Sequence, residues 1–150
     1  MQNQKLKSFE IVALEISFLI HATEDRERVL NLVSSFMNAD KEGFEVEKLL
    51  GHWRNQIDMV KGKLEGELAR NVATNILSSL EPYDRKKMLY SLGTYIDDKG
   101  ILHLRLDKQK ICERKIELSD VDSIKIKFKP KLFFSRIKQD YIHEYRRLLD

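Results

Sequence analysis

Cysteine and proline are scarce in this chain of 150 residues, which holds one Cys and two Pro. Because Cys112 is alone, there is neither a disulfide framework nor a cysteine zinc cluster. No apolar run approaches the roughly 20 residues of a membrane span, and the first ten residues lack the apolar core of a signal peptide. The composition, 42% hydrophobic and 34% charged, excludes collagen-like chains and argues against general disorder. We therefore expect a soluble, cytoplasmic protein.

Patterns typical of catalysis or metal binding are also missing. The four histidines lack the spacing of paired metal ligands, and the glycines of "GKLEGE" do not match a phosphate-binding loop. Asp97 and Asp98 stand in a predicted helix-to-strand turn, where Asp is a common turn former. Only a convergence of Asp97, Asp98 and Asp107 on one cleft would indicate a metal-dependent nuclease or transferase. The sequence predicts a protein that is not an enzyme and has no cofactor and no metal.

Apolar periodicity predicts one α+β domain over residues 1–150, in the order β-α-β-β-α-α-β-β-β-α. Thr23 is expected to cap the first helix, with Glu24 and Asp25 in its first turn. Short turns between strands favour an antiparallel-rich mixed sheet with helices packed on one face. The expected strands are 9–20, 43–50, 57–65, 101–106, 115–119 and 123–129, and the expected helices are 23–37, 65–80, 82–96 and 135–150.

Basic charge is concentrated at the end of the chain. The net charge is +3, but residues 1–120 carry a net −1, from 19 Lys and Arg against 20 Asp and Glu. Residues 121–150 carry 8 against 4, a net +4. This local excess suggests a surface that faces a polyanion.

The excess begins at "SIKIKFKPK", residues 123–131, where apolar residues alternate with lysines. Successive side chains of a strand point to opposite faces, so Lys125, Lys127 and Lys129 share one face, and Lys131 extends the row. Lysines two residues apart are about 6.6–6.8 Å apart, close to the phosphate spacing of one nucleic-acid strand. Outward lysines are also an ordinary protection of an edge strand against aggregation. Both interpretations stay open, and Arg105 would join the row if its strand is adjacent.

A second motif, "GHWRN" at residues 51–55, falls between two predicted strands. Its aromatic residue could stack on an unpaired base, with Arg54 and His52 as further contacts. Alternatively, Trp53 closes one end of the core, which is the more usual role of a lone Trp. We expect the core role for Trp53 and retain Arg54 and His52 as candidates.

Three stretches together resemble an archaeal family of RNA-binding domains described as predicted exosome subunits. They are "HATED" after the first strand, "GHWRN", and "DDKGILHLRLDKQ" before and within a later strand, in matching order over about residues 9–129. The second motif departs from the family pattern Gly-His-Tyr-Gly-Asn-Pro: Trp53 replaces the aromatic residue, and Arg54 and Gln56 replace Gly and Pro. Lys110 also stands where a small residue is usual. The resemblance implies a fold like that of the large-subunit ribosomal protein that contacts the small ribosomal RNA, and it implies RNA binding without an established reaction.

We therefore predict a non-catalytic RNA-binding protein that acts in RNA processing or ribosome-related assembly through a basic sheet surface. The main predicted contacts are Lys125, Lys127, Lys129 and Lys131, and the weaker candidates at the rim are Arg105, Lys108, Arg54 and His52. The alternative is a protein-interaction module of an RNA-processing assembly, which docks through a sheet edge or the C-terminal helix. That helix carries a stripe of Ile137, Tyr141, Tyr145 and Leu148.

Overall fold

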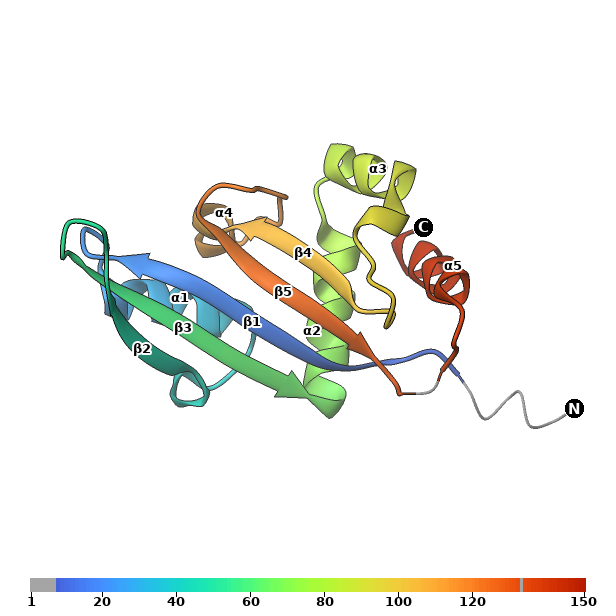
Figure 1. Ribbon diagram of the computed structural model, residues 1–150, viewed down its shortest axis with the longest axis horizontal. Helices are drawn as coiled ribbons and strands as arrows, with labels where there is room; N and C mark the ends of the chain where they lie inside the picture. Colours follow the sequence, from blue (N-terminus) through green and yellow to red (C-terminus); the bar gives the residue numbers. More distant parts are fainter. Residues whose placement is uncertain (1–7, 133) are drawn as a thin grey trace, which may run out of the picture.

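A five-stranded antiparallel sheet is the centre of the computed structural model, which describes residues 8–132 and 134–150 (Figure 1). The strands are β1 (Ile11–His21), β2 (Glu45–Leu50), β3 (Gln56–Glu65), β4 (Leu102–Asp107) and β5 (Ser123–Pro130). They lie in the order β2-β3-β1-β5-β4, and each neighbouring pair is antiparallel. The predicted α+β class with an antiparallel-rich sheet is confirmed.

The helices leave one face of the sheet open. Figure 1 shows α1 and α2 behind the strands, whereas α3 and α5 stand at the end of the sheet where β4 and β5 meet α2. None of the described helices is both long and apolar enough to cross a membrane. The helices are α1 (Arg26–Phe36), α2 (Gly66–Ser79), α3 (Pro82–Tyr90), α4 (Lys108–Cys112) and α5 (Lys138–Leu149), with short 3₁₀ turns η2 (Lys41–Gly43) and η3 (Leu92–Thr94).

Strand alternation decides which residues enter the core between the sheet and its helices. On β5, Ile124, Ile126 and Phe128 are buried while Lys125 and Lys127 between them are exposed. The same alternation buries three leucines of β4 and the even-numbered residues 14–20 of β1. Each such buried side chain stabilises the fold by about 1.5–3 kcal/mol, which fixes the register of the strands against a one-residue slip.

Three local predictions are wrong. The helix expected over residues 82–96 ends at Tyr90 and is followed by the turn η3. Residues 115–119 do not form a strand but make isolated bridges, from Ile116 to Leu80 and from Leu118 to Leu106. Asp84 from α3 accepts the Leu118 N–H at 2.9 Å, so a side chain takes a donor that a strand ladder would use. The first helix is capped by Asp25 and not by Thr23, because the Asp25 carboxylate accepts the Arg28 N–H.

Helix α5 packs on the core of the same chain. Tyr145 is fully buried, and its hydroxyl lies 3.0 Å from the Gly100 carbonyl oxygen and 3.2 Å from that of Phe128. Tyr141 and Leu149 are buried with it, whereas Ile137 and Leu148 of the predicted stripe are exposed. The packed face of the helix therefore keeps the two tyrosines of the predicted stripe but has Leu149 in place of Ile137 and Leu148.

Candidate nucleic-acid interface

The lysine-bearing strand β5 lies inside the sheet. It is paired to β1 on one side and to β4 on the other, so both rows of its backbone hydrogen-bonding groups are used. Lysines that protect a strand edge are needed only where a strand has a free edge. Edge protection therefore does not explain Lys125, Lys127 and Lys129, which face solvent on the side of the sheet without helices.

Strand register aligns basic residues from β3, β4 and β5 on either side of β1. Ser17 on β1 is opposite both Lys61 on β3 and Lys125 on β5, and Lys125 is opposite Arg105 on β4. In the neighbouring row, Glu15 is opposite both Lys63 and Lys127, and Lys127 is opposite His103. Because neighbouring strands lie about 4.7–4.9 Å apart, these side chains share one continuous surface. We call it the cationic face, and it comprises Lys61, Lys63, Lys125, Lys127, Lys129, Arg105 and His103.

Most charges of the cationic face have no acidic partner. Within residues 8–132 and 134–150, no salt bridge is found at Lys61, Lys63, Lys125, Lys127 or Arg105. Lys125 and Arg105 even stand directly opposite each other, and such like-charged pairs destabilise a sheet. His103 is different, because its Nε2 lies 2.9 Å from an Asp97 carboxylate oxygen.

Glu15 is the acid at the centre of the cationic face. The hydrogen bond from Lys129 lowers the pKa of the Glu15 carboxyl, partial burial opposes this shift, and the charges of Lys129, Lys127 and Lys63 lower the pKa further. Strand register places Glu15 opposite Lys63 on β3 and Lys127 on β5, so lysines of both strands act on this one carboxylate. Glu15 thus neutralises Lys129, whereas Lys61, Lys63, Lys125, Lys127 and Arg105 have no salt-bridge partner among the described residues.

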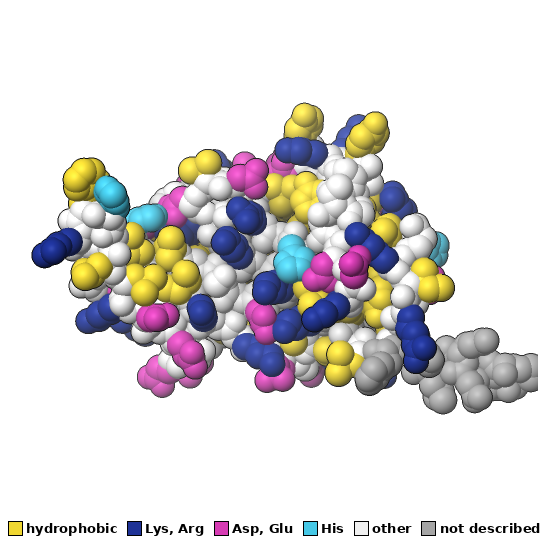
Figure 2. All heavy atoms as spheres, viewed as in Figure 1, with side chains coloured by type: hydrophobic (Ala, Val, Ile, Leu, Met, Phe, Trp, Pro, Cys, Tyr) yellow, Lys and Arg dark blue, Asp and Glu magenta, His cyan; other side chains and the backbone are white. Residues whose placement is uncertain are grey.

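The open face is hollowed where these strands meet. A shallow depression of about 590 Å³ is lined by residues of β1, β3, β4 and β5, including Glu15, Lys61, Arg105 and Lys125. Figure 2 shows several Lys and Arg side chains over the middle of this face, with acidic side chains along the lower margin, near the top and beside a His. One acid of the lining, Glu45 on β2, stands opposite Lys61 in register.

Lys61 and Lys63 were not predicted as site residues. Their signal is present in the sequence, since Lys61 and Lys63 alternate with the buried Val60 and Leu64 and must point to the opposite face. Alternation does not say which strand pairs with β3. Only the pairing of β3 with β1 brings these two lysines next to the lysines of β5.

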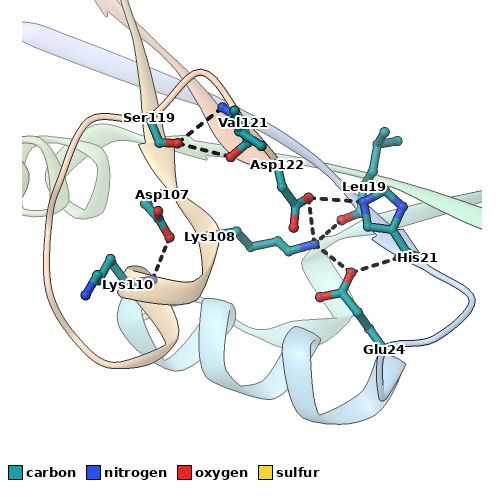
Figure 3. A network of polar contacts seen from close by, with 9 residues as sticks. All are labelled: Leu19, His21, Glu24, Asp107, Lys108, Lys110, Ser119, Val121 and Asp122. Atoms are coloured by element: carbon teal, nitrogen blue, oxygen red, sulfur yellow. Dashed lines mark hydrogen bonds and ion pairs between the residues drawn. The ribbon is translucent and has the colours of Figure 1, made fainter.

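Lys108 is buried, so the expectation of a rim contact at this residue is corrected. Its ammonium donates to Glu24 at 2.7 Å, to the Leu19 carbonyl at 2.7 Å and to Asp122 at 3.1 Å (Figure 3). The three N–H donors of the ammonium thus meet three acceptors. Lys108 therefore joins β1, the turn between β1 and α1, and the segment before β5 as a structural residue.

The same network explains a cluster of possible metal ligands. His21, Glu24 and Asp122 place ligand atoms within 4.8 Å of one another. The Lys108 ammonium already lies between the two carboxylates and supplies the positive charge (Figure 3). The predicted acids near β4 order backbone instead: Asp97 accepts from the N–H groups of Lys99 and Ile101, and Asp107 caps α4.

The pKa of Asp97 is lowered in this turn. Partial burial raises it, but the hydrogen bond from His103 and the two backbone N–H groups outweigh that effect. The turn-forming role predicted for Asp97 is confirmed. Asp97 precedes β4 and Asp107 ends it, so the two acids lie at opposite ends of one strand.

The turn between β2 and β3 carries the second group of predicted contacts. Trp53 is 84% exposed, so the expected role in the core is wrong. Its ring packs edge-on against the His52 ring with centroids 4.7 Å apart, and Arg54 adopts a left-handed backbone conformation with φ of 62°. Arg54 and His52 are exposed, as is Lys131 just after β5. The turn therefore presents an indole, an imidazole and a guanidinium to solvent.

A comparison with protein families shows which family this chain matches. The family model described as RNA binding matches residues 13–130, a span from the third residue of β1 to the last residue of β5. The matched residues thus include four whole strands, all but the first two residues of β1, and the whole cationic face. The chain belongs to this RNA-binding family.

Relatives and solved structures extend over nearly the same length. An RNA-binding protein of Pyrococcus abyssi is 29% identical over 126 residues, which are 80% of this chain and 82% of the relative. An uncharacterized protein of Methanocaldococcus jannaschii is 26% identical over 139 residues, 88% of this chain and 93% of the relative. The structure of a DUF54 protein from Methanothermobacter thermautotrophicus has a TM-score of 0.76 at 23% identity and covers 93% of this chain and 98% of that one. The last likeness supports the fold.

Proposed function

Because this chain is a member of the RNA-binding family, we propose that it binds the phosphate backbone of RNA through the cationic face. The observation that carries the proposal is that Lys61, Lys63, Lys125, Lys127 and Arg105 converge from three strands on an open surface without salt-bridge partners among the described residues. Lys129 is held by Glu15 and lies at the margin. Lys131 extends the row beyond β5.

The attraction is electrostatic. Each lysine or arginine that neutralises a phosphate releases condensed counterions, so affinity falls as salt rises. With five phosphate contacts, log K plotted against log salt should have a slope of about −3.5 for a single strand and about −4.5 for a duplex. A broad, shallow depression lined by cations fits recognition of backbone shape and charge, with limited reading of bases.

Arg54 and His52 form a second set of proposed contacts at the β2–β3 turn. Counted along β3, this turn is about 17 Å from Lys61, so an RNA that covers the cationic face can also reach it. Trp53 would there offer a ring for stacking on an unpaired base. Lys108 is left out of the proposed surface because its ammonium is buried.

We propose that the protein acts without catalysis, in RNA processing or ribosome-related assembly. Support for a non-catalytic role comes from four carboxylates: Asp25 and Asp107 cap helices, Asp97 orders a turn and Glu24 pairs with Lys108. The alternative of a protein-docking module gains little support from α5, whose tyrosines pack inside this chain. Its remaining basis is the free edge of β2.

Fluorescence anisotropy with a structured RNA at two salt concentrations tests the proposal. We expect binding at low salt, weakening at high salt, and a loss of at least tenfold in affinity in Lys125→Glu. Arg28→Glu is the matched control, because it makes the same change in net charge at an exposed residue of α1, on the helix-covered side of the sheet. Absence of binding at low salt, or equal losses in both variants, would contradict the proposal.

A further inference from the structure

Helix α3 presents two tyrosines and two lysines along one exposed face. Tyr83 is 73% exposed and Tyr90 is 95% exposed, and Lys86 and Lys87 between them are exposed as well. With about 100° of rotation per residue, all four side chains fall within an arc of about 100°. The two tyrosines are about 10.5 Å apart along the helix axis. Single exposed aromatic residues are common, but a pair on one helix face that flanks two cations is a more specific arrangement.

The tyrosines do not hold this helix in place. Other residues do: Met88 is buried, Asp84 accepts the Leu118 N–H, and Glu81 caps the first turn by accepting from Tyr83 and Asp84 N–H groups. Arg146 of α5 also contacts the Leu89 carbonyl. The exposed face of α3 is therefore carried on an anchored helix and does not supply packing to the fold.

This face continues into the cationic face. A depression of about 240 Å³ lies between α3 and β4, and Lys87, His103 and Arg105 are among the residues that line it. His103 and Arg105 also line the larger depression over the sheet. Two acids, Asp84 and Asp120, belong to the smaller depression, and the Asp84 carboxylate is engaged by the Leu118 N–H.

The two lysines and two tyrosines of the α3 face are suited to a ligand that carries both negative charges and aromatic rings. In the described part of the chain, the ammonium groups of Lys86 and Lys87 are in no salt bridge. Bases stack on exposed aromatic side chains while cations neutralise the phosphates between them, and this works only where the bases are unpaired. The spacing of about 10.5 Å exceeds the stacked step of about 3.4 Å, so the two rings would hold bases that are splayed apart.

We propose that the exposed face of α3 binds a single-stranded extension of an RNA whose structured part lies on the cationic face. Tyr83 and Tyr90 stack on unpaired bases, and Lys86 and Lys87 neutralise the intervening phosphates. The inference rests on the proposed function, because it assigns the route by which RNA continues from Arg105 over the edge of β4. The ligand class is thus a duplex with an unpaired end.

Three RNAs test this inference by fluorescence anisotropy. One is a blunt duplex of about 16 base pairs, the second is the same duplex with uridine arms unpaired at one end, and the third has abasic arms that keep the phosphates and remove the bases. The wild-type chain should bind the uridine fork about tenfold more tightly than the abasic fork, the value expected for one well-stacked base. Both strand polarities are present in a fork, so either arm can reach α3.

The variant Tyr83→Ala/Tyr90→Ala should lose this preference and keep the affinity for the blunt duplex. The matched control Tyr83→Phe/Tyr90→Phe should retain the preference, since stacking needs the ring and not the hydroxyl. Thermal unfolding of both variants should equal that of the wild type because both side chains are exposed.

Two results would overturn the inference: equal affinity of the wild type for the uridine and abasic forks, or a preference that survives in the double alanine variant. The second result is also what a protein-binding role of α3 predicts. Failure of the proposed function looks different, since then the wild type binds none of the three RNAs at low salt. If Lys125→Glu leaves blunt-duplex binding intact while the double alanine variant loses the fork preference, only the assignment of the cationic face fails.

Discussion

Lys129 on β5 donates a hydrogen bond to Glu15 on β1, and this contact joins an acid at the centre of the cationic face to a lysine at its margin. Glu15 is opposite Lys63 and Lys127 in register, so it reduces the repulsion among three lysines at once. The cationic face therefore combines a stabilising internal acid with cations that stay available to a ligand.

Removal of this acid should strengthen RNA binding and weaken the fold. In Glu15→Gln we expect the affinity for structured RNA to rise several-fold, with a steeper salt dependence, because Lys129 is freed for a phosphate. Anisotropy titrations at several salt concentrations measure both effects. Unchanged affinity in Glu15→Gln would show that the RNA does not approach this part of the sheet.

The Glu15 pKa also predicts how this contact depends on pH. Its pKa is lowered in the folded protein, so its stabilising contribution is present above the pKa of the unfolded chain and is lost as pH falls through the folded pKa, below 4.5. The difference in unfolding free energy between wild type and Glu15→Gln should therefore shrink as pH falls through this range. Urea unfolding at a series of acidic pH values measures it, and a difference that grows toward low pH would contradict the assignment.

The facing pair of Lys125 and Arg105 predicts a conflict between stability and binding. Like charges directly opposite each other on a sheet cost about 0.2–1 kcal/mol, so Arg105→Thr should raise the unfolding free energy by an amount in this range. The same substitution should weaken RNA binding and reduce the salt slope by about one. Urea unfolding and salt titrations provide the two readouts. A loss of both stability and binding would point to a packing role of Arg105.

Substitution of Lys108 should lower the unfolding free energy, unlike substitution of the surface lysines. Loss of its ammonium leaves Glu24 and Asp122 without their shared partner, and breaking a buried charge network costs about 3–5 kcal/mol. We expect the low end of this range for Lys108→Met because Asp122 is partly solvated, with 35% of its side chain exposed. Lys125→Met is the control and should change the unfolding free energy by less than about 0.5 kcal/mol. Equal unfolding midpoints in the two variants would contradict the burial of Lys108.

Gly100 should tolerate no side chain. Its φ is +82°, and a Cβ atom at this position would clash with the Tyr141 ring. Gly100→Ala therefore combines the strain of a left-handed conformation, about 1–2 kcal/mol, with overpacking against α5 of about 1–3 kcal/mol. Thermal unfolding should show a clear drop in Tm. Gly43→Ala is the matched control, since nothing lies within 4 Å of a Cβ there.

Trp53 gives a fluorescence test of the β2–β3 turn, since it is the only Trp of the chain. Trp53→Ala should change the unfolding free energy by less than about 0.5 kcal/mol, whereas a buried aromatic residue would cost about 3–5 kcal/mol. The wild-type emission should be that of a solvated indole, and bound RNA should quench it. Full emission in the RNA complex would remove this turn from the proposed contacts.

Burial of the Tyr145 hydroxyl group shows what sequence reasoning missed at the C-terminus. The spacing of residues 137, 141, 145 and 148 predicts a stripe, but the chain turns Tyr141, Tyr145 and Leu149 inward. Burial raises the pKa of Tyr145, and its hydroxyl contacts carbonyls of Gly100 and Phe128. Neither acceptor is predictable from the helix itself, because both belong to distant segments.

Alternation along single strands was enough to place Lys125, Lys127 and Arg105 on the solvent face, since side chains of a strand must point to opposite sides. The same alternation, continued from the buried Leu102, Leu104 and Leu106, places Lys108 on the buried side. We expected it at the surface because it is charged. Strand order, in contrast, cannot be predicted from alternation within a single strand. The placement of β5 between β1 and β4, and of β3 beside β1, comes from long-range pairing and helix packing. The sequence determined which residues could face solvent, and only the tertiary structure decided which charges became neighbours, because Coulomb interactions act across strands and alternation acts along one.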